Sequence, residues 1–205
     1  DIVELLLNME NIDINETTKE GCTSLYIASY KGHKDIVEIL LNMKNIDANI
    51  RTNKGSTSLF IASANGHKDI VELLLNMKNI DVNKPDKTFG VTPLRIASEN
   101  GHKDIVELLL KMNNIDVNKA TNMGLTPLYV ASERGHKDVV ELLLSMNNID
   151  VNKQEKNEAT PLYIASQEGY KDIVELLLNM ENIDVNKPDN KGVTPLSHTS
   201  DEGHK

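Results

Sequence analysis

Near-copies of one segment run from one end of this chain to the other. Residues 92–110 show it in full as Thr-Pro-Leu-Arg-Ile-Ala-Ser-Glu-Asn-Gly-His-Lys-Asp-Ile-Val-Glu-Leu-Leu-Leu. Its glycine recurs in steps of 34 or 35 residues, at Gly32, Gly66, Gly101, Gly135, Gly169 and Gly203. So short a unit cannot bury its own apolar face and must stack on a neighbour. The repeat therefore predicts one elongated body instead of a compact globule.

The period divides the 205 residues into five full units between two half units. We place the full units at 20–53, 54–88, 89–122, 123–156 and 157–190, and the half units at 1–19 and 191–205. This exceeds the roughly three units that a stable stack needs. We expect a single all-α solenoid over 1–205, and a fragment of a longer array, because the sequence opens and closes within a unit.

Each unit predicts two short helices. Thr92 is an N-cap residue, Pro93 suits the first helical position, and Gly101 ends the first helix in the left-handed conformation. The second helix, expected over residues 103–112, is apolar except for one polar stripe, so it must be covered on several sides. After it, an asparagine is expected to take the left-handed conformation in each unit, at Asn11, Asn45, Asn79, Asn114, Asn148 and Asn182.

About fourteen polar residues then join one unit to the next. Ile80 and Val82 alternate with polar residues, which indicates a short extended arm, and Gly90 supplies a turn. We expect these arms to project as a row of hairpin-like tips.

Composition and charge exclude several functions. The net charge of −9 lacks the basic footprint of nucleic-acid binding, and no apolar run reaches the length of a membrane span. Cys22 is the only cysteine and fits a reducing compartment, so we expect a cytoplasmic protein.

The histidines and carboxylates do not suggest chemistry. His33, His67, His102 and His136 occur once per unit, and stacked helices lie roughly 8 to 10 Å apart, too far for them to share a metal ion. We expect capping and hydrogen bonding between units instead. Asp35 and Glu38 recur on every unit as a solvated ridge. No phosphate loop or nucleophile motif is present, so we expect no enzyme, no cofactor, no metal and no small-molecule substrate.

The repeated pattern Gly-x-Thr-Pro-Leu-x-x-Ala-Ser-x-x-Gly-His-x-Asp-Ile-Val-x-Leu-Leu-Leu, followed by Asp-Val-Asn, closely resembles the ankyrin repeat over the whole chain. Three departures stand out. Each unit has one residue more than the usual ankyrin unit, after the second helix. The usual histidine after Thr-Pro-Leu is replaced, by Tyr26, Phe60, Arg95, Tyr129, Tyr163 and Ser197. Glu158 replaces a turn glycine, and Asn157 is expected to take the strained conformation in its place.

The resemblance implies a scaffold that binds a partner protein through a concave groove and the hairpin tips. The positions that differ most between units are the candidate contacts, with neutral drift at exposed sites as the alternative. They are Tyr30, Lys31, Asn53, Lys54, Ser56, Asn65, Thr88, Phe89, Val91, Arg95, Glu99, Asn100, Asn122, Met123, Leu125, Glu133, Arg134, Lys156, Asn157, Gln167 and Glu168.

Two other functions stay open, a targeting or regulatory arm of a larger enzyme or channel, and a structural spacer. We expect a monomer, with head-to-tail association through the two half units as an alternative. Phe89 is the strongest candidate contact, because its arm contains the one added residue that makes a 35-residue step. It either lies exposed for a partner or folds back near Lys54 or Met123.

Overall fold

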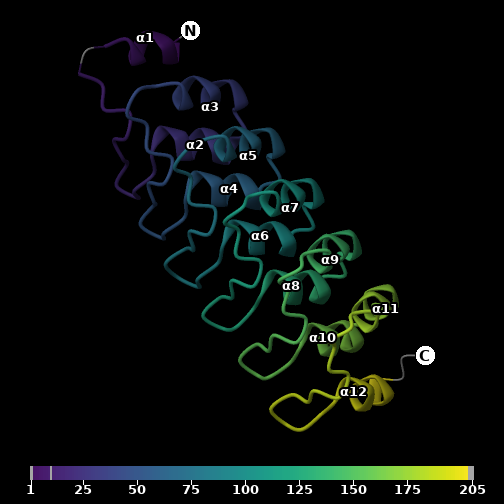
Figure 1. The fold of residues 1–205 in the computed structure, drawn as a ribbon. Helices are drawn as coiled ribbons and strands as arrows, with labels where there is room; N and C mark the ends of the chain where they lie inside the picture. The colour runs from purple at the N-terminus through teal and green to yellow at the C-terminus, as the bar shows by residue number, and fades with distance from the viewer. Residues whose placement is uncertain (1, 10, 203–205) are drawn as a thin grey trace.

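The computed structural model describes residues 2–9 and 11–202, and these form twelve helices and no strand. Figure 1 shows helix pairs stacked along one axis, with α1 and α12 at opposite ends and the loops between units in a row. The first helices of the pairs are α2 Ser24–Lys31, α4 Ser58–Ala64, α6 Pro93–Glu99, α8 Pro127–Glu133, α10 Pro161–Gln167 and α12 Pro195–Glu202. The second helices are α1 Ile2–Leu7, α3 Lys34–Leu41, α5 Lys68–Leu75, α7 Lys103–Leu110, α9 Lys137–Leu144 and α11 Lys171–Leu178. The predicted solenoid is confirmed.

The caps and stops that define each first helix lie where the sequence predicts them. The Thr92 hydroxyl accepts a hydrogen bond from the backbone N–H of Arg95 at 3.2 Å, and Pro93 begins α6. Gly101 follows with a φ of 70°. A Cβ there would also lie 2.7 Å from the ring of His136 in the next unit, so glycine is needed for space as well as conformation. Gly203 lies outside the described residues.

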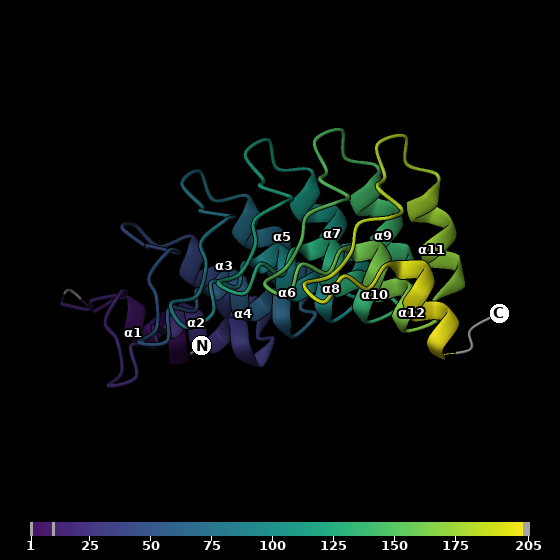
Figure 2. The same cartoon turned by 90° about the horizontal axis from the view of Figure 1, so that it is seen from below.

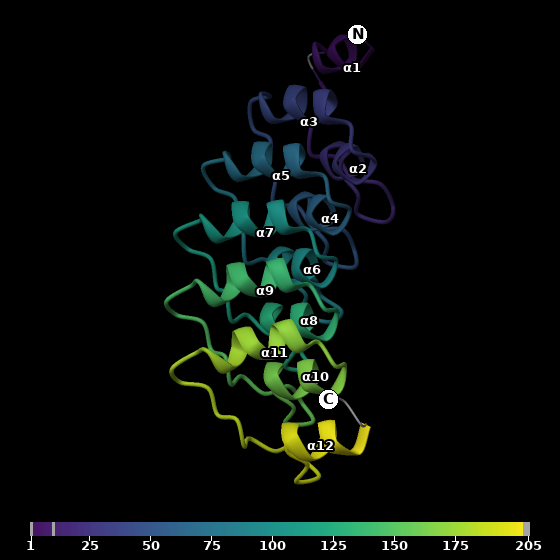
Figure 3. The same cartoon turned by 90° about the vertical axis from the view of Figure 1, so that its right-hand side faces the viewer.

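The second helices form one layer of the stack, and the first helices form a layer beside it (Figure 3). α7 packs on α6 of its own unit and on α5 and α9 of the neighbouring units. Ile105, Val106 and Leu109 are accordingly at most 1 % exposed. The helix ends at Leu110, two residues earlier than predicted, because the next residues turn with i to i+3 hydrogen bonds such as Met112 N–H to Leu109 C=O at 3.1 Å.

The expected left-handed asparagine occurs at Asn45, which has a φ of 69°. Asn79, Asn114, Asn148 and Asn182 have no positive φ, so the prediction is wrong for them. Asn11 directly follows residue 10, which lies outside the described residues, so the prediction for Asn11 stays untested. Two successive turns end the second helix instead: Met77 N–H donates to Leu74 C=O, and Ile80 N–H donates to Met77 C=O. These bonds reverse the chain without a left-handed residue.

The asparagine of each Asp-Val-Asn motif joins one unit to the next. The Asn83 amide donates to the carbonyl of Asn114 at 2.6 Å and accepts from the backbone N–H of Asp116 at 2.9 Å. The same pair of bonds recurs at Asn15, Asn49, Asn118 and Asn152. We call this series of asparagine bonds the asparagine ladder. Val82, which was expected in an extended arm, lies in no strand and is fully buried next to Asn83 in the chain.

The charged side chains on the second helices are exposed, as expected, but they also form ion pairs between neighbouring units. Lys103 Nζ lies 3.2 Å from Asp138 of the next unit, and equivalent ion pairs join Lys34 to Asp69, Lys68 to Asp104 and Lys137 to Asp172. All of these side chains are about half exposed or more, so each pair adds little stability.

The strained residue at the fifth tip is Glu158 itself, with a φ of 65°, and not Asn157 as predicted. Glutamate keeps the glycine conformation because the surrounding turn is fixed by hydrogen bonds: Glu158 N–H donates to Glu155 C=O at 2.9 Å. The turn geometry therefore overrides the preference of this residue.

Glu158→Gly is expected to raise the free energy of unfolding by up to about 1 kcal/mol, because glycine adopts this conformation without strain. Urea unfolding would measure the shift in midpoint. Glu158→Ala is the control, since it removes the carboxylate and keeps the strain. A gain with alanine equal to the gain with glycine would show that the charge, and not the backbone, is the cause.

Candidate functional site

Each hairpin tip is a turn held by one side-chain oxygen at its base. Asp86 Oδ1 accepts the backbone N–H of Phe89 at 3.1 Å and of Val91 at 2.8 Å. Thr121 Oγ1 accepts from Met123 and Leu125 in the next tip. The same role falls to Thr18, Thr52, Glu155 and Asp189. These residues support the turns, and the sequence reasoning missed them, although a polar residue three or four positions before each turn glycine, or before Glu158 in the fifth tip, was a visible signal.

The tips are also bonded to one another, which holds them in one row (Figure 2). Asn122 N–H donates to the carbonyl of Phe89, and Lys156 N–H to the carbonyl of Met123, both at 2.9 Å. We call the residues that accept these bonds, together with Lys191 at the same place in the last tip, the tip ridge: Glu20, Lys54, Phe89, Met123, Asn157 and Lys191. Neighbouring tips therefore present their side chains at a fixed spacing.

The middle of the tip ridge is apolar and exposed. Phe89 is 62 % exposed and Met123 is 45 % exposed. Phe89 is thus open to solvent, and the alternative that it folds back against the neighbouring arm does not describe the structure. Three exposed lysines lie on nearby tips: Lys54 on the second tip, Lys87 on the third tip with Phe89, and Lys156 on the fifth tip.

A charged cluster lies on α6 and α8 behind the tips. Arg95 is buried and its Nη1 lies 2.7 Å from Glu99 Oε2, while Nη2 of Arg134 lies 3.6 Å from Glu99 Oε1. Burial lowers the pKa of Arg95, and the charge of Glu99 opposes that change. Glu99 thus pairs with both arginines, and Nε of Arg134, whose side chain is 55 % exposed, also lies 3.7 Å from Glu133 Oε2.

The candidate contact residues fall into three groups. Val91 and Arg95 are buried and offer almost no surface, contrary to their selection as contacts. Four asparagines are exposed, but each donates its side-chain amide to a carbonyl of the preceding unit: Asn53 to Lys19, Asn65 to Tyr30, Asn100 to Ala64 and Asn122 to Thr88. The remaining candidates are exposed or partly exposed. The exposed ones are Tyr30, Lys31, Lys54, Thr88, Phe89, Met123, Arg134, Lys156, Asn157 and Glu168.

The aromatic residues that follow Thr-Pro-Leu form a second apolar cluster under the last tips. Tyr129 and Tyr163 are each 6 % exposed and pack with Val130, Ala159 and Ile164. Burial raises the pKa of Tyr129 far above its usual value, and the nearby charge of Glu155 adds to the rise. The Tyr163 hydroxyl donates to Asp189 Oδ2 at 3.1 Å, so this tyrosine ties the first helix to the following tip.

The histidines bridge units, as the spacing predicts. Nε2 of His136 donates to the carbonyl of Glu99 at 2.9 Å, and His102 and His67 bond to Ala64 and Tyr30 in the same way. They make no side-chain cap bond to their own helices, so the capping part of that prediction is wrong. Within residues 2–9 and 11–202, no group of three or more His, Cys, Asp or Glu could hold a metal ion.

Comparison with known proteins agrees with this geometry. The family model for ankyrin repeats matches three times, at residues 1–86, 78–155 and 146–205. A search of curated proteins found no matching sequence. None of the described helices has the length and hydropathy that crossing a membrane requires.

Proposed function

Because this chain belongs to the ankyrin-repeat family, whose members are generally protein-interaction modules, we propose that it binds a partner protein through the tip ridge and the adjoining ends of the first helices. The fold is typically a non-catalytic scaffold. Binding requires a surface that is exposed, rigid and different from unit to unit, and the tip ridge has all three properties.

The observation that favours this function most is Phe89. Its side chain is 62 % exposed on a tip whose backbone is fixed by Asp86 on one side and Asn122 on the other. A rigid, exposed aromatic residue loses little entropy on binding and buries a large apolar area. Such residues near the centre of an interface often contribute 2 kcal/mol or more.

The charges around Phe89 indicate the chemistry of the partner segment. Lys54 and Lys87 are exposed on the second and third tips, whereas exposed carboxylates lie farther from Phe89, with Glu20 on the first tip and Glu158 beside Lys156 on the fifth. The carboxylate of Asp86 faces the backbone N–H groups of its own turn. The proposed partner segment therefore places an apolar side chain against Phe89 and Met123, with carboxylates toward the lysines.

Phe89→Ala is expected to weaken partner binding at least tenfold, about 1.4 kcal/mol, while leaving the unfolding midpoint nearly unchanged. A partner isolated on the immobilised chain would be titrated against both forms by calorimetry. Leu178→Ala is the matched control, because Leu178 is 47 % exposed but lies on a second helix away from the tips.

Two results would contradict this prediction. If Phe89→Ala and Leu178→Ala weaken binding equally, the effect is not local to the tip ridge. If Phe89→Ala lowers the unfolding midpoint and leaves binding unchanged, Phe89 is a packing residue, and the interface has to be sought around Tyr30 and Arg134.

A further inference from the structure

Two of the turns that join a first helix to its second helix contain an asparagine followed by glycine. Asn65 and Asn100 are the only asparagines in the chain that directly precede a glycine. In such a pair the backbone nitrogen of the glycine can attack the side-chain Cγ of the asparagine, because glycine has no side chain to shield it. The new bond closes a succinimide ring, the C–NH₂ bond breaks, and the glycine proton leaves with the amide as ammonia. Water then opens the ring to aspartate or isoaspartate.

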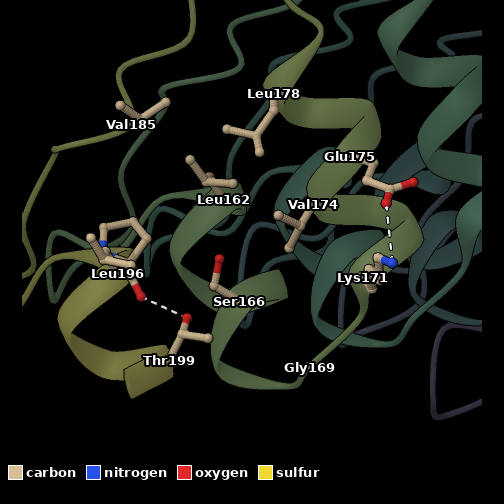
Figure 4. Close-up of a pocket in the computed structure, with 11 residues that line it drawn as sticks. Leu162, Ser166, Gly169, Lys171, Val174, Glu175, Leu178, Val185, Leu196 and Thr199 are labelled. Atoms are coloured by element: carbon tan, nitrogen blue, oxygen red, sulfur yellow. Dashed lines mark hydrogen bonds and ion pairs between the residues drawn. The ribbon is translucent and has the colours of Figure 1, made fainter. Parts of the chain in front are cut away.

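The other full units carry no amide at this place, where they have Lys31, Arg134 and Glu168. Figure 4 shows the turn of the fifth unit, in which Gly169 joins α10 to α11 beside an apolar pocket. Its backbone is built in the same way, with a φ of 73° at Gly169. The carboxylate of Glu168 has no amide to lose, so this chemistry is confined to the second and third full units.

The folded backbone holds both Asn-Gly pairs away from the geometry of ring closure. Asn65 and Asn100 each have a ψ of 0°. At this angle the next backbone nitrogen eclipses the nitrogen of the asparagine itself, so it lies about a third of a turn away from the Cα–Cβ bond. Ring closure requires that nitrogen and the side chain to lie on the same side. The peptide bond between the two residues therefore has to rotate before the reaction.

Packing against the next unit blocks that rotation. A Cβ on Gly101 would lie 2.7 Å from the ring of His136, and one on Gly66 would lie 2.9 Å from the ring of His102. These glycines have no room to move toward the next unit. The residue after each glycine is also fixed, since His102 N–H donates to Ala97 C=O at 3.0 Å. The reaction is thus closed as long as the units are stacked.

The side-chain amides of the two asparagines also bond the units together. Asn100 Nδ2 donates to Ala64 C=O at 2.8 Å, and Asn65 Nδ2 donates to Tyr30 C=O at 3.0 Å. Deamidation replaces each donor with a carboxylate oxygen that faces the carbonyl oxygen, so an attraction becomes a repulsion. Isoaspartate adds a carbon atom to the main chain of the turn as well. Either product weakens the junction with the preceding unit.

We propose that Asn65 and Asn100 are deamidation sites that stay closed in the stacked array and react when a unit separates from its neighbours. Local separation needs less free energy than unfolding of the whole chain, so it exposes these turns first. Each reaction leaves a carboxylate that disfavours restacking. The modification is therefore irreversible and accumulates in the middle of the array.

The rate of ammonia loss tests the first part of the proposal. The full chain is incubated in mildly alkaline buffer with and without guanidinium chloride, and its peptides are followed by mass spectrometry. In denaturant, Asn65 and Asn100 should react before every other asparagine, and in the folded chain both should react at least about tenfold more slowly. His136→Ala removes the ring that covers Gly101 and leaves His102 against Gly66, so it should raise the rate at Asn100 more than at Asn65.

The unfolding midpoint tests the second part. Asn100→Asp reproduces the aspartate product and should lower the midpoint in denaturant. Thr88→Asp is the matched control, because it adds the same charge at an exposed tip residue and should leave the midpoint nearly unchanged.

Four outcomes would overturn the proposal. Equal rates at Asn65 and Asn100 in the folded and denatured chain would show that stacking does not protect them. Faster reaction of other asparagines in denaturant would show that these two pairs are not the reactive sites. Equal acceleration of both sites by His136→Ala would show that the reaction follows unfolding of the whole array. Equal midpoints for Asn100→Asp and Thr88→Asp would show that the product does not weaken the junction.

Discussion

Leu109→Ala is expected to lower the free energy of unfolding by about 2 to 5 kcal/mol, the usual range for emptying a buried leucine site. Leu109 is 0 % exposed in α7, which is covered by α5, α6 and α9. The lost methyl groups leave a cavity between α7 and the helices that cover it. Because the asparagine bonds hold the neighbouring units in place, these helices cannot easily move in to fill the cavity. Chemical denaturation monitored by circular dichroism would measure the loss.

Leu6→Ala is the matched comparison, because Leu6 occupies the same place in α1 and is 57 % exposed. Its cost should stay near the roughly 0.5 kcal/mol typical of surface substitutions. The contrast follows from a stack in which each unit is stabilised by its direct neighbours. Equal losses from the two substitutions, at a concentration where the chain is monomeric, would refute that description.

Gly55→Ala is expected to cost about 2 to 4 kcal/mol, from backbone strain together with overpacking. Gly55 has a φ of 88°, and a Cβ there would overlap the backbone nitrogen of Lys87 in the next tip. To relieve the overlap, the Lys87 N–H bond to the carbonyl of Lys54, 3.1 Å long, has to lengthen or break. The substitution therefore separates two neighbouring tips.

Gly192→Ala provides the control for strain alone. Gly192 has a similar φ of 79°, but a Cβ there would have nothing within 4 Å. It should cost only about 1 to 2 kcal/mol, the left-handed penalty. If both alanines cost the same in denaturant unfolding, contact between the tips contributes nothing to stability.

The sequence predicted the parts of this fold that are set within one unit. Thr92, Pro93 and Gly101 act over three or four residues, so their spacing alone specified the helix bounds. The role of Asn83 could not be predicted in this way, because its partners are backbone groups of the next unit. A periodic pattern shows that units stack, but it does not show which carbonyl faces which amide.

The candidate site was predicted less completely than the fold. Phe89 is 62 % exposed, as a contact residue has to be, and its role in binding stays a prediction. The burial of Arg95 was not predicted; its guanidinium pairs with Glu99, one turn later on the same helix. Glu158 was misjudged because the hydrogen bonds of the turn, and not the identity of the residue, set the backbone conformation.

The asparagine ladder makes every junction between units chemically the same. Asn15, Asn49, Asn83, Asn118 and Asn152 each meet a carbonyl and an N–H at equivalent places in the following unit. Removing or duplicating one whole unit would therefore create no new kind of junction, because the donors and acceptors on both sides of the cut already match. Gene rearrangements in steps of one unit can then lengthen or shorten the array while each tip keeps its bonded neighbours, so the length of the tip ridge can change without a change in how it is built.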